Sequence, residues 1–281
     1  MKRVRKILEN KQFLIYLSLS MIVILIAILA PILAPKDPYH AVMLDSLKPP
    51  SKEYILGTDV LGRDIFSRII YGTRTTLVMA FSLLAIVFFV GGTLGVIAGF
   101  YGGIVDNVIM KISDMMMAFP GLILAIAIAG ILGPSTFNAV LAISLVTWPR
   151  YARLARSLTL KIRKNTYIEV AIMGGITPLN LFLKYLLPNI FPTMLVTATI
   201  DIGMLILEIT SLSFLGVGVQ APIPEWGLML NEGRLYIFKA PWLIYSPGIA
   251  IIIVVVIFNL LGDSIRAVSY THLTLPTIYS V

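Results

Sequence analysis

The most prominent feature of the chain is a series of long apolar stretches without a charged side chain. A transmembrane helix needs about 20 mostly apolar residues to cross roughly 30 Å of hydrocarbon. The stretch over residues 115–149 is long enough for two such helices, which Gly133 and Pro134 would separate. We therefore predict an all-α, polytopic membrane protein with six transmembrane helices, over residues 13–35, 75–105, 115–132, 136–156, 189–217 and 243–262.

Both ends of the chain are predicted to lie in the cytoplasm. The apolar run 13–35 is longer than the core of a cleaved signal peptide, about 7–15 residues, so we expect it to remain as an anchor. Six spans place both termini on one side, and an excess of Lys and Arg marks the cytoplasmic side. This rule favours a cytoplasmic N-terminus over residues 1–12 and an extracytoplasmic segment over 36–74. The remaining five spans form the predicted core domain, over 75–266.

Composition excludes several classes of protein. Apolar residues make up 58% of the chain and charged residues only 13%, which is atypical of a soluble domain. The basic excess falls mainly in predicted cytoplasmic loops, so we predict no nucleic-acid partner. The chain has no Cys and only two His residues, without ligand-like spacing, so we predict no metal site. It has no Gly-Lys dipeptide and hence no Walker A loop, so we predict no cofactor and no ATP site within it.

One predicted cytoplasmic loop, residues 157–188, is longer than a connection between two helices requires. A short helix is expected over residues 167–173, and Gly174 and Gly175 would end it. Thr177 and Pro178 then have the pattern of a second helix start, with that helix running to residue 187. The helix pair would either rest on lipid headgroups or dock a cytoplasmic partner.

The loop resembles the EAA loop of ABC-importer permeases, whose pattern runs from Glu-Ala-Ala through a glycine to Leu-Pro. The residues in register are Glu169, Ala171, Gly175, Leu187 and Pro188. Val170 and Tyr185 depart from the pattern at packing positions. Further stretches, over residues 56–72, 148–153, 208–218, 226–234 and 259–263, are similar to the C-type subunits of the oligopeptide/dipeptide/nickel permease family. The resemblance covers about residues 10–266.

The resemblance implies a type I ABC importer permease fold in a bacterial or archaeal cell membrane. It implies half of a translocation path for di- or oligopeptides, or for nickel or other metal complexes. The implied partners are a homologous permease that completes a heterodimer, two cytoplasmic ATPase subunits that hold ATP and Mg, and an extracytoplasmic substrate-binding protein. The five residues in register with the EAA pattern would then couple the permease to the ATPases, with Gly175 allowing the sharp corner. Glu169 would pair with a basic group of the partner, or else cap its own backbone or remain solvated.

Two ionisable residues interrupt the apolar run 189–217. Asp201 and Glu208 are seven residues apart and therefore lie on one helix face, which is expected to look toward protein or water. A charged side chain inside a span is costly and indicates function by default. We predict that both line the translocation path, with Asp201 favouring cationic or metal-bearing substrates. A structural role, with a bond to the backbone, is the alternative for Glu208. Unchanged transport of every substrate by Asp201→Asn would exclude the role of Asp201.

Three further features carry expectations. Asp59, Arg63 and Asp64 would either pair with one another or contact a substrate-delivering protein at the outer face. Gly91, Gly95, Gly99 and Gly103 recur once per helical turn, which is typical of close helix packing in membranes, with a lining of the path as the alternative. Residues 267–281 lack the charged end expected from the resemblance, and we predict that this tail is non-native.

Two other classes of protein remain as alternatives. A self-sufficient secondary transporter or channel would show inverted repeats and broken helices at the membrane midplane, and the two halves of the chain show no convincing repeat. An intramembrane enzyme would need a nucleophile with a base, or metal ligands, inside the spans. No Cys or His lies in a predicted span, and Asp201 and Glu208 are too far apart for a tight dyad.

Overall fold

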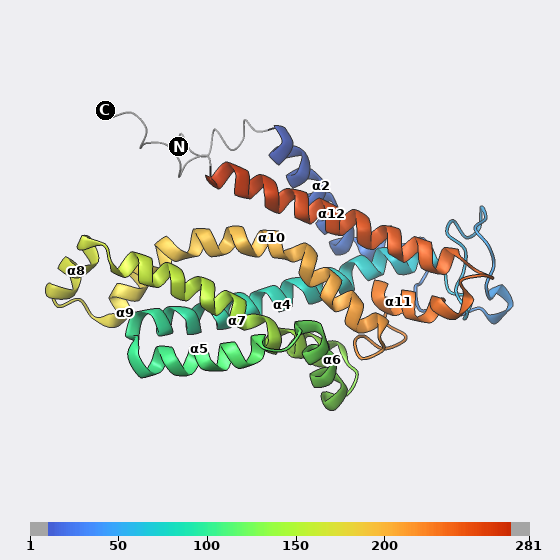
Figure 1. Ribbon diagram of the computed structural model, residues 1–281. Coiled ribbons are helices and arrows are strands. Elements are labelled where there is room, and N and C mark those ends of the chain that lie inside the picture. The colour runs from blue at the N-terminus through green and yellow to red at the C-terminus, as the bar shows by residue number, and fades with distance from the viewer. Residues whose placement is uncertain (1–10, 271–281) are drawn as a thin grey trace. The chain divides into compact units, whose positions relative to one another are not determined.

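The computed structural model describes residues 11–270, and the predicted tail lies largely outside this range (Figure 1). The described chain is helical, as predicted, with an isolated bridge between Thr58 and Asp64. Its helices are α2 (Lys11–Ile28), α3 (Ala30–Leu33), α4 (Ile65–Tyr101), α5 (Gly103–Met117), α6 (Gly121–Leu132), α7 (Thr136–Arg163), α8 (Thr166–Met173), α9 (Pro178–Leu181), α10 (Leu187–Phe214), α11 (Trp226–Gly233) and α12 (Trp242–Tyr270). The short turns are η1 (Met43–Asp45), η2 (Phe182–Leu186) and η3 (Arg234–Tyr236).

Four of the described helical stretches are long and apolar enough to cross a membrane: α2, α4, residues 182–214 and residues 242–267. A fifth span would be the pair α5 and α6, which is bent by 91° where the sequence predicts one helix over 115–132. The break precedes Pro120, because a residue before proline avoids the helical conformation. Helix α7 is not among these candidates, since its second half carries several Arg and Lys residues. The predicted count of six is therefore not confirmed.

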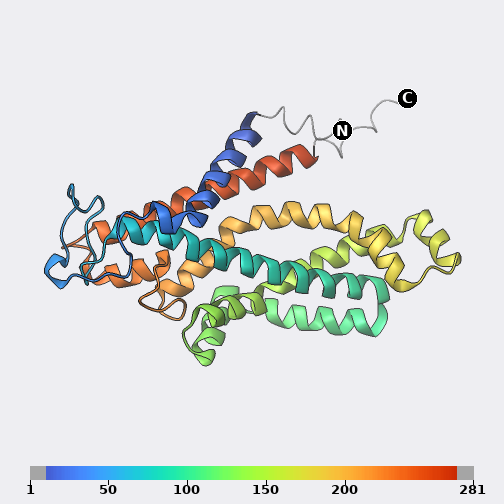
Figure 2. The ribbon, with the colours of Figure 1, turned by 180° about the vertical axis from the view of Figure 1, so that it is seen from behind.

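The chain forms two compact units. The first comprises the described parts of residues 1–81, 129–140 and 199–281, and the second comprises residues 82–128 and 141–198. In the first unit α12 packs against both α2 and α11 (Figure 1, Figure 2). Close approaches also join α10 to α12, because a Cβ added at Gly262 would lie 2.6 Å from the Ile200 Cα.

In the second unit α4 and α7 pack through the predicted glycine stripe. A Cβ atom would lie 2.5 Å from the Trp148 carbonyl oxygen at Gly91, and 2.1 Å from the Ala152 carbonyl oxygen at Gly95. At Gly99 it would lie 2.8 Å from the Thr159 Cβ. The packing interpretation is therefore confirmed for these three glycines, whereas Gly103 begins α5 in open space.

We expect Gly95→Ala to lower the stability of the purified protein by about 1–3 kcal/mol, because a methyl group cannot fit against the α7 backbone. Gly130→Ala is the matched control: Gly130 is also helical, and nothing lies within 4 Å of its Cβ position. This control should be neutral or stabilise by up to about 1 kcal/mol. Thermal unfolding in detergent measures both, and equal midpoints for the two variants would contradict the packing role.

Ion pairs also join α5 to α7 in the second unit. The Arg156 guanidinium makes a bidentate contact with the Asp106 carboxylate, with both atom pairs 2.5 Å apart. Arg153 donates to Asp114, and Arg163 donates to the Phe100 carbonyl oxygen at the end of α4. The two carboxylates of α5, Asp106 and Asp114, thus have partners within the unit.

Candidate functional site

The loop over residues 157–188 contains the predicted pair of short helices. Helix α8 begins at Thr166, and Gly175 forms the corner after it with a φ of +76°, where a side chain would be strained. Ile168 and Leu181 are buried, and the Tyr167 and Tyr185 rings stack 6.3 Å apart, so the two halves of the loop pack together. The second helix does not end at residue 187 as predicted, because α9 continues through the π-helical turn η2 into α10.

The five predicted coupling residues lie on the surface of this loop or at its edge. Glu169 is exposed in the first turn of α8, and Ala171 is half-buried on the same helix. Leu187 and Pro188 are exposed at the start of α10. Val170 and Met173 add exposed apolar side chains, with 62% and 87% of their surface accessible. Helix α8 therefore presents exposed apolar side chains and one carboxylate beside a glycine corner.

The two predicted path residues lie on α10. Asp201 is buried with 3% of its surface exposed, and Glu208 is half-buried two turns later. Their burial agrees with a helix face that looks toward protein or water. A Cβ at nearby Gly203 would lie 2.1 Å from the Asn259 Oδ1 atom, so α12 approaches α10 closely between the two carboxylates. Lining of the path by these residues stays a prediction.

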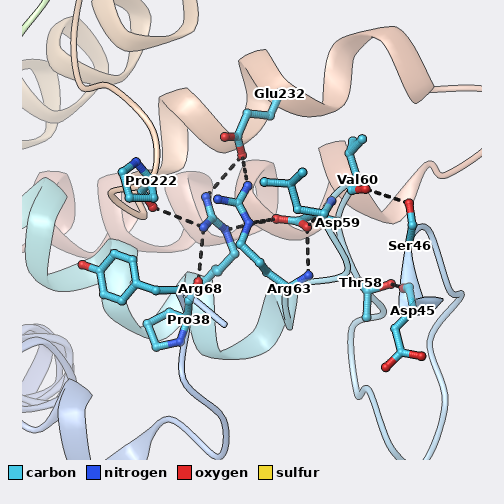
Figure 3. A network of polar contacts seen from close by, with 12 residues as sticks. Pro38, Asp45, Ser46, Thr58, Asp59, Val60, Arg63, Arg68, Pro222 and Glu232 are labelled. Atoms are coloured by element: carbon cyan, nitrogen blue, oxygen red, sulfur yellow. Dashed lines mark hydrogen bonds and ion pairs between the residues drawn. The ribbon is translucent and has the colours of Figure 1, made fainter. Parts of the chain in front are cut away.

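A buried charge network lies in the first unit, where the segment after Asp59 enters α4 (Figure 3). Arg63 Nε lies 2.5 Å from Asp59 Oδ2, and Arg63 Nη2 donates to Glu232 Oε2 over 3.0 Å. Arg68 Nη2 donates to the same Glu232 oxygen over 3.2 Å, and Arg68 Nε lies 3.5 Å from Asp59 Oδ2. Arg63 and Arg68 are 3% and 1% exposed, so both guanidinium groups are neutralised inside the protein rather than by water.

The predicted outer-face residues fall partly within this network. Asp59 and Arg63 pair with each other, as one of the two interpretations expected. Asp64 instead accepts hydrogen bonds from the Ser67 backbone N–H and hydroxyl, which caps the start of α4. All three side chains are buried and offer little surface to a partner. Contact with a substrate-delivering protein stays a prediction for them.

Polar contacts also order the loop before α4. The Tyr54 hydroxyl donates to Asp45 over 2.5 Å, which raises the pKa of Tyr54 to about 12. Hydrogen bonds from Lys48 and then Tyr54 lower the pKa of the Asp45 carboxyl. The Lys36 ammonium lies 3.5 Å from the centre of the Tyr54 ring. The loop is thus a fixed element rather than a loose connection.

Glu225 holds α11 against α4. Its carboxylate accepts the backbone N–H groups of Gly227 and Leu228 at the start of α11, and the Thr76 hydroxyl of α4 donates to it over 3.3 Å. The side chain is completely buried, and this burial raises the pKa of Glu225. Next to it, Trp226 is 1% exposed and donates to the Ile69 carbonyl oxygen.

The sequence analysis did not single out Arg68, Glu225 or Glu232. Arg68 and Glu232 lie within stretches that carried the family resemblance, which was the available signal. Arg63 and Glu232 are 169 positions apart, so no local spacing indicates that they meet.

Comparisons with known proteins agree with this architecture. The family described as "Binding-protein-dependent transport system inner membrane component" matches residues 91–273. The dipeptide transport system permease protein DppC of Alkalihalophilus pseudofirmus is 42% identical over 262 residues, covering 93% of this chain and 86% of the relative. The nickel transport system permease protein NikC of Escherichia coli K12 is 39% identical, covering 89% of this chain and 92% of the relative.

The fold has a solved counterpart. A structure of the inward-facing MetNI methionine ABC transporter matches with a TM-score of 0.58, and the match covers 73% of this chain and 97% of the matched chain. The two sequences are 22% identical, so this likeness supports the fold alone. The family match covers most of the chain, and the named relatives are permeases of transport systems. The chain therefore belongs to the family of binding-protein-dependent transport system inner membrane components, and it is a permease subunit of an ABC importer.

Proposed function

We propose that this permease carries di- or oligopeptides as one half of a path that a second, homologous permease completes. The support is that relatives named for dipeptide, di/tripeptide and glutathione transport are 39–42% identical over most of the chain. Nickel or another metal complex is the second candidate, because NikC is 39% identical. Asp201, buried on α10, is the residue for which we propose contact with cationic groups of the cargo.

We also propose that the loop over residues 157–188 docks one of two cytoplasmic ATPase subunits, which hold ATP and Mg and hydrolyse the ATP. The observation that carries this proposal is the surface of α8, where Val170 and Met173 are exposed beside Glu169 and the Gly175 corner. Exposed apolar side chains on a short, well-packed helix suit a protein groove better than water. The Glu169 carboxylate would pair there with a basic group of the ATPase.

The proposal extends to the outer face and to the cell membrane. An extracytoplasmic substrate-binding protein would deliver the cargo, as the family description indicates for such systems. The N- and C-termini would lie in the cytoplasm, so the loop before α4 and the segment between α10 and α12 would face the binding protein.

We expect Glu169→Lys to reduce recovery of the ATPase when the chain is co-expressed with its genomic neighbours and purified through a tag. Reversing the charge removes the pairing group without changing a buried contact, since Glu169 is exposed. Lys164→Glu, a charge reversal at another exposed position of the loop, is the control and should retain the ATPase. Equal loss in both variants would contradict a specific role for Glu169.

Transport by the recovered complex shows whether the cargo is a peptide or a metal. Reconstituted into liposomes with its binding protein and ATP, it should accumulate a labelled dipeptide and leave labelled nickel outside. Accumulation of nickel alone would favour the second candidate. Transport by this chain alone, without ATP, would overturn the importer mechanism in favour of a secondary transporter.

A further inference from the structure

A cavity of about 240 Å³ opens beside the buried charge network in the first unit. Its walls include the apolar residues Val60 and Leu61 from the loop before α4, and Met229, Tyr236 and Leu243 from the segment α11 to α12. Pockets for small organic ligands usually measure roughly 300–1,000 Å³, so this cavity suits a single bulky side chain better than a free peptide.

At one end of the cavity, buried positive and negative side chains balance one another. Arg63 and Arg68 meet Asp59 and Glu232 there (Figure 3). With two guanidinium groups and two carboxylates in contact, the cavity has no need of a bound ion. The open part of the cavity is mainly apolar, so an uncharged apolar group is the ligand that fits it.

Exposed apolar residues lie on η3, which contributes to these walls, and on η1, whose following residue is bonded to them. Leu44 in η1 is 93% exposed, and Leu235 and Phe238, in and just after η3, are 81% and 101% exposed. Ser46 donates to the Val60 carbonyl oxygen, and Tyr236 lies in the cavity wall, so both turns connect directly to the rim. Large side chains this exposed, gathered around a cavity, mark a contact surface.

The part of this surface around η3 carries two positive charges without a carboxylate partner. Arg234 and Lys239, in and just after η3, are exposed and form no ion pair with any other residue of the described chain. In the loop before α4, Asp45 and Glu53 are paired with Lys48 and Lys36 respectively, and Asp37 is the exposed carboxylate without an ion pair in the described chain. An isolated positive rim favours a negatively charged partner and speeds its association.

We propose that this surface docks an acidic face of the substrate-binding protein, with one apolar side chain of that protein inserted into the 240 Å³ cavity. The inference rests on the proposed function, which places a binding protein at this side of the membrane. It adds the residues that form the contact and the chemistry of the partner: carboxylates opposite Arg234 and Lys239, around an apolar anchor.

The test is the affinity of the purified binding protein for the complete transporter in lipid nanodiscs, followed as association and dissociation rates at several salt concentrations. We expect Arg234→Glu combined with Lys239→Glu to slow association about tenfold at low salt. Glu53→Lys, at an exposed position of the loop before α4, should instead speed association, because it adds positive charge. Leu61→Trp, which fills the cavity, should speed dissociation with little effect on association.

The outcomes separate this inference from the proposed function. If the unaltered transporter does not bind the binding protein at all, the proposed function fails. If it binds, and the charge-reversed and cavity-filled variants bind equally well, the docking surface is wrong. A loss of co-purified anionic lipid from the charge-reversed variant, with unchanged protein binding, would assign the surface to lipid headgroups and overturn the inference as well.

Discussion

Replacing Gly175 by valine is expected to uncouple the transporter, with transport falling roughly five- to thirty-fold. Gly175 has a φ of +76°, and a β-branched residue in that conformation is strained by about 1–2 kcal/mol. Nothing lies within 4 Å of its Cβ position, so the penalty comes from the backbone alone. The corner after α8 would therefore change shape and move the surface that carries Glu169.

Gly175→Asn separates this backbone effect from the mere presence of a side chain. Asparagine adopts positive φ more readily than other residues with a Cβ, so this variant should keep most of the transport and ATPase recovery. The measurement is ATP-driven uptake into liposomes, together with the ATPase activity of the complex. Unimpaired uptake with valine, or equal loss with asparagine and valine, would show that the conformation of the corner is not what coupling requires.

Arg68→Met should destabilise the protein by about 3–5 kcal/mol, because it removes one of two buried guanidinium groups and leaves Asp59 and Glu232 to share the single positive charge of Arg63. Arg68 is 1% exposed, and its guanidinium contacts Glu232 Oε2 and lies 3.5 Å from Asp59 Oδ2. Methionine fills a similar volume, so lost pairing rather than a cavity would cause the effect. Unfolding of the detergent-solubilised protein with increasing denaturant measures the change.

Glu53→Gln provides the comparison for an exposed ion pair. Glu53 lies 3.9 Å from Lys36, and their side chains are 69% and 37% exposed, so its removal should cost less than about 1 kcal/mol. If Arg68→Met were no more destabilising than Glu53→Gln, the buried network would not hold the loop to α4 and α11. The docking surface proposed above would then lack its support.

The helices were predictable where a long apolar run coincides with one helix. The structure has α4 and α12 over the predicted runs, although α4 begins ten residues earlier, at Ile65. The third predicted span, over residues 115–132, began only after the charged residues Asp106, Lys111 and Asp114. In the structure they belong to α5, where Asp106 and Asp114 pair with arginines of α7.

The loop that is proposed to dock the ATPase was also predictable, because its signals are local. Gly174 and Gly175 mark the corner, and the register of Glu169 with Leu187 and Pro188 needs only residue spacing. The charge network was only half predictable. The pair Asp59 and Arg63 is four residues apart, but the shared acceptor Glu232 comes from a distant helix.

The sequence by itself determined the helical class, the membrane location, the family and the glycine corner. The class, the location and the corner depend on hydrogen bonds within a segment, on the length of apolar runs and on allowed values of φ, all of which act between near neighbours. The family follows from short motifs, each of which is also local in the chain. Only the tertiary structure decided which buried charges meet, where Glu225 holds α11, and that the loop before α4 closes one wall of a cavity. Those features join residues far apart in the chain, and their geometry follows from packing rather than from spacing.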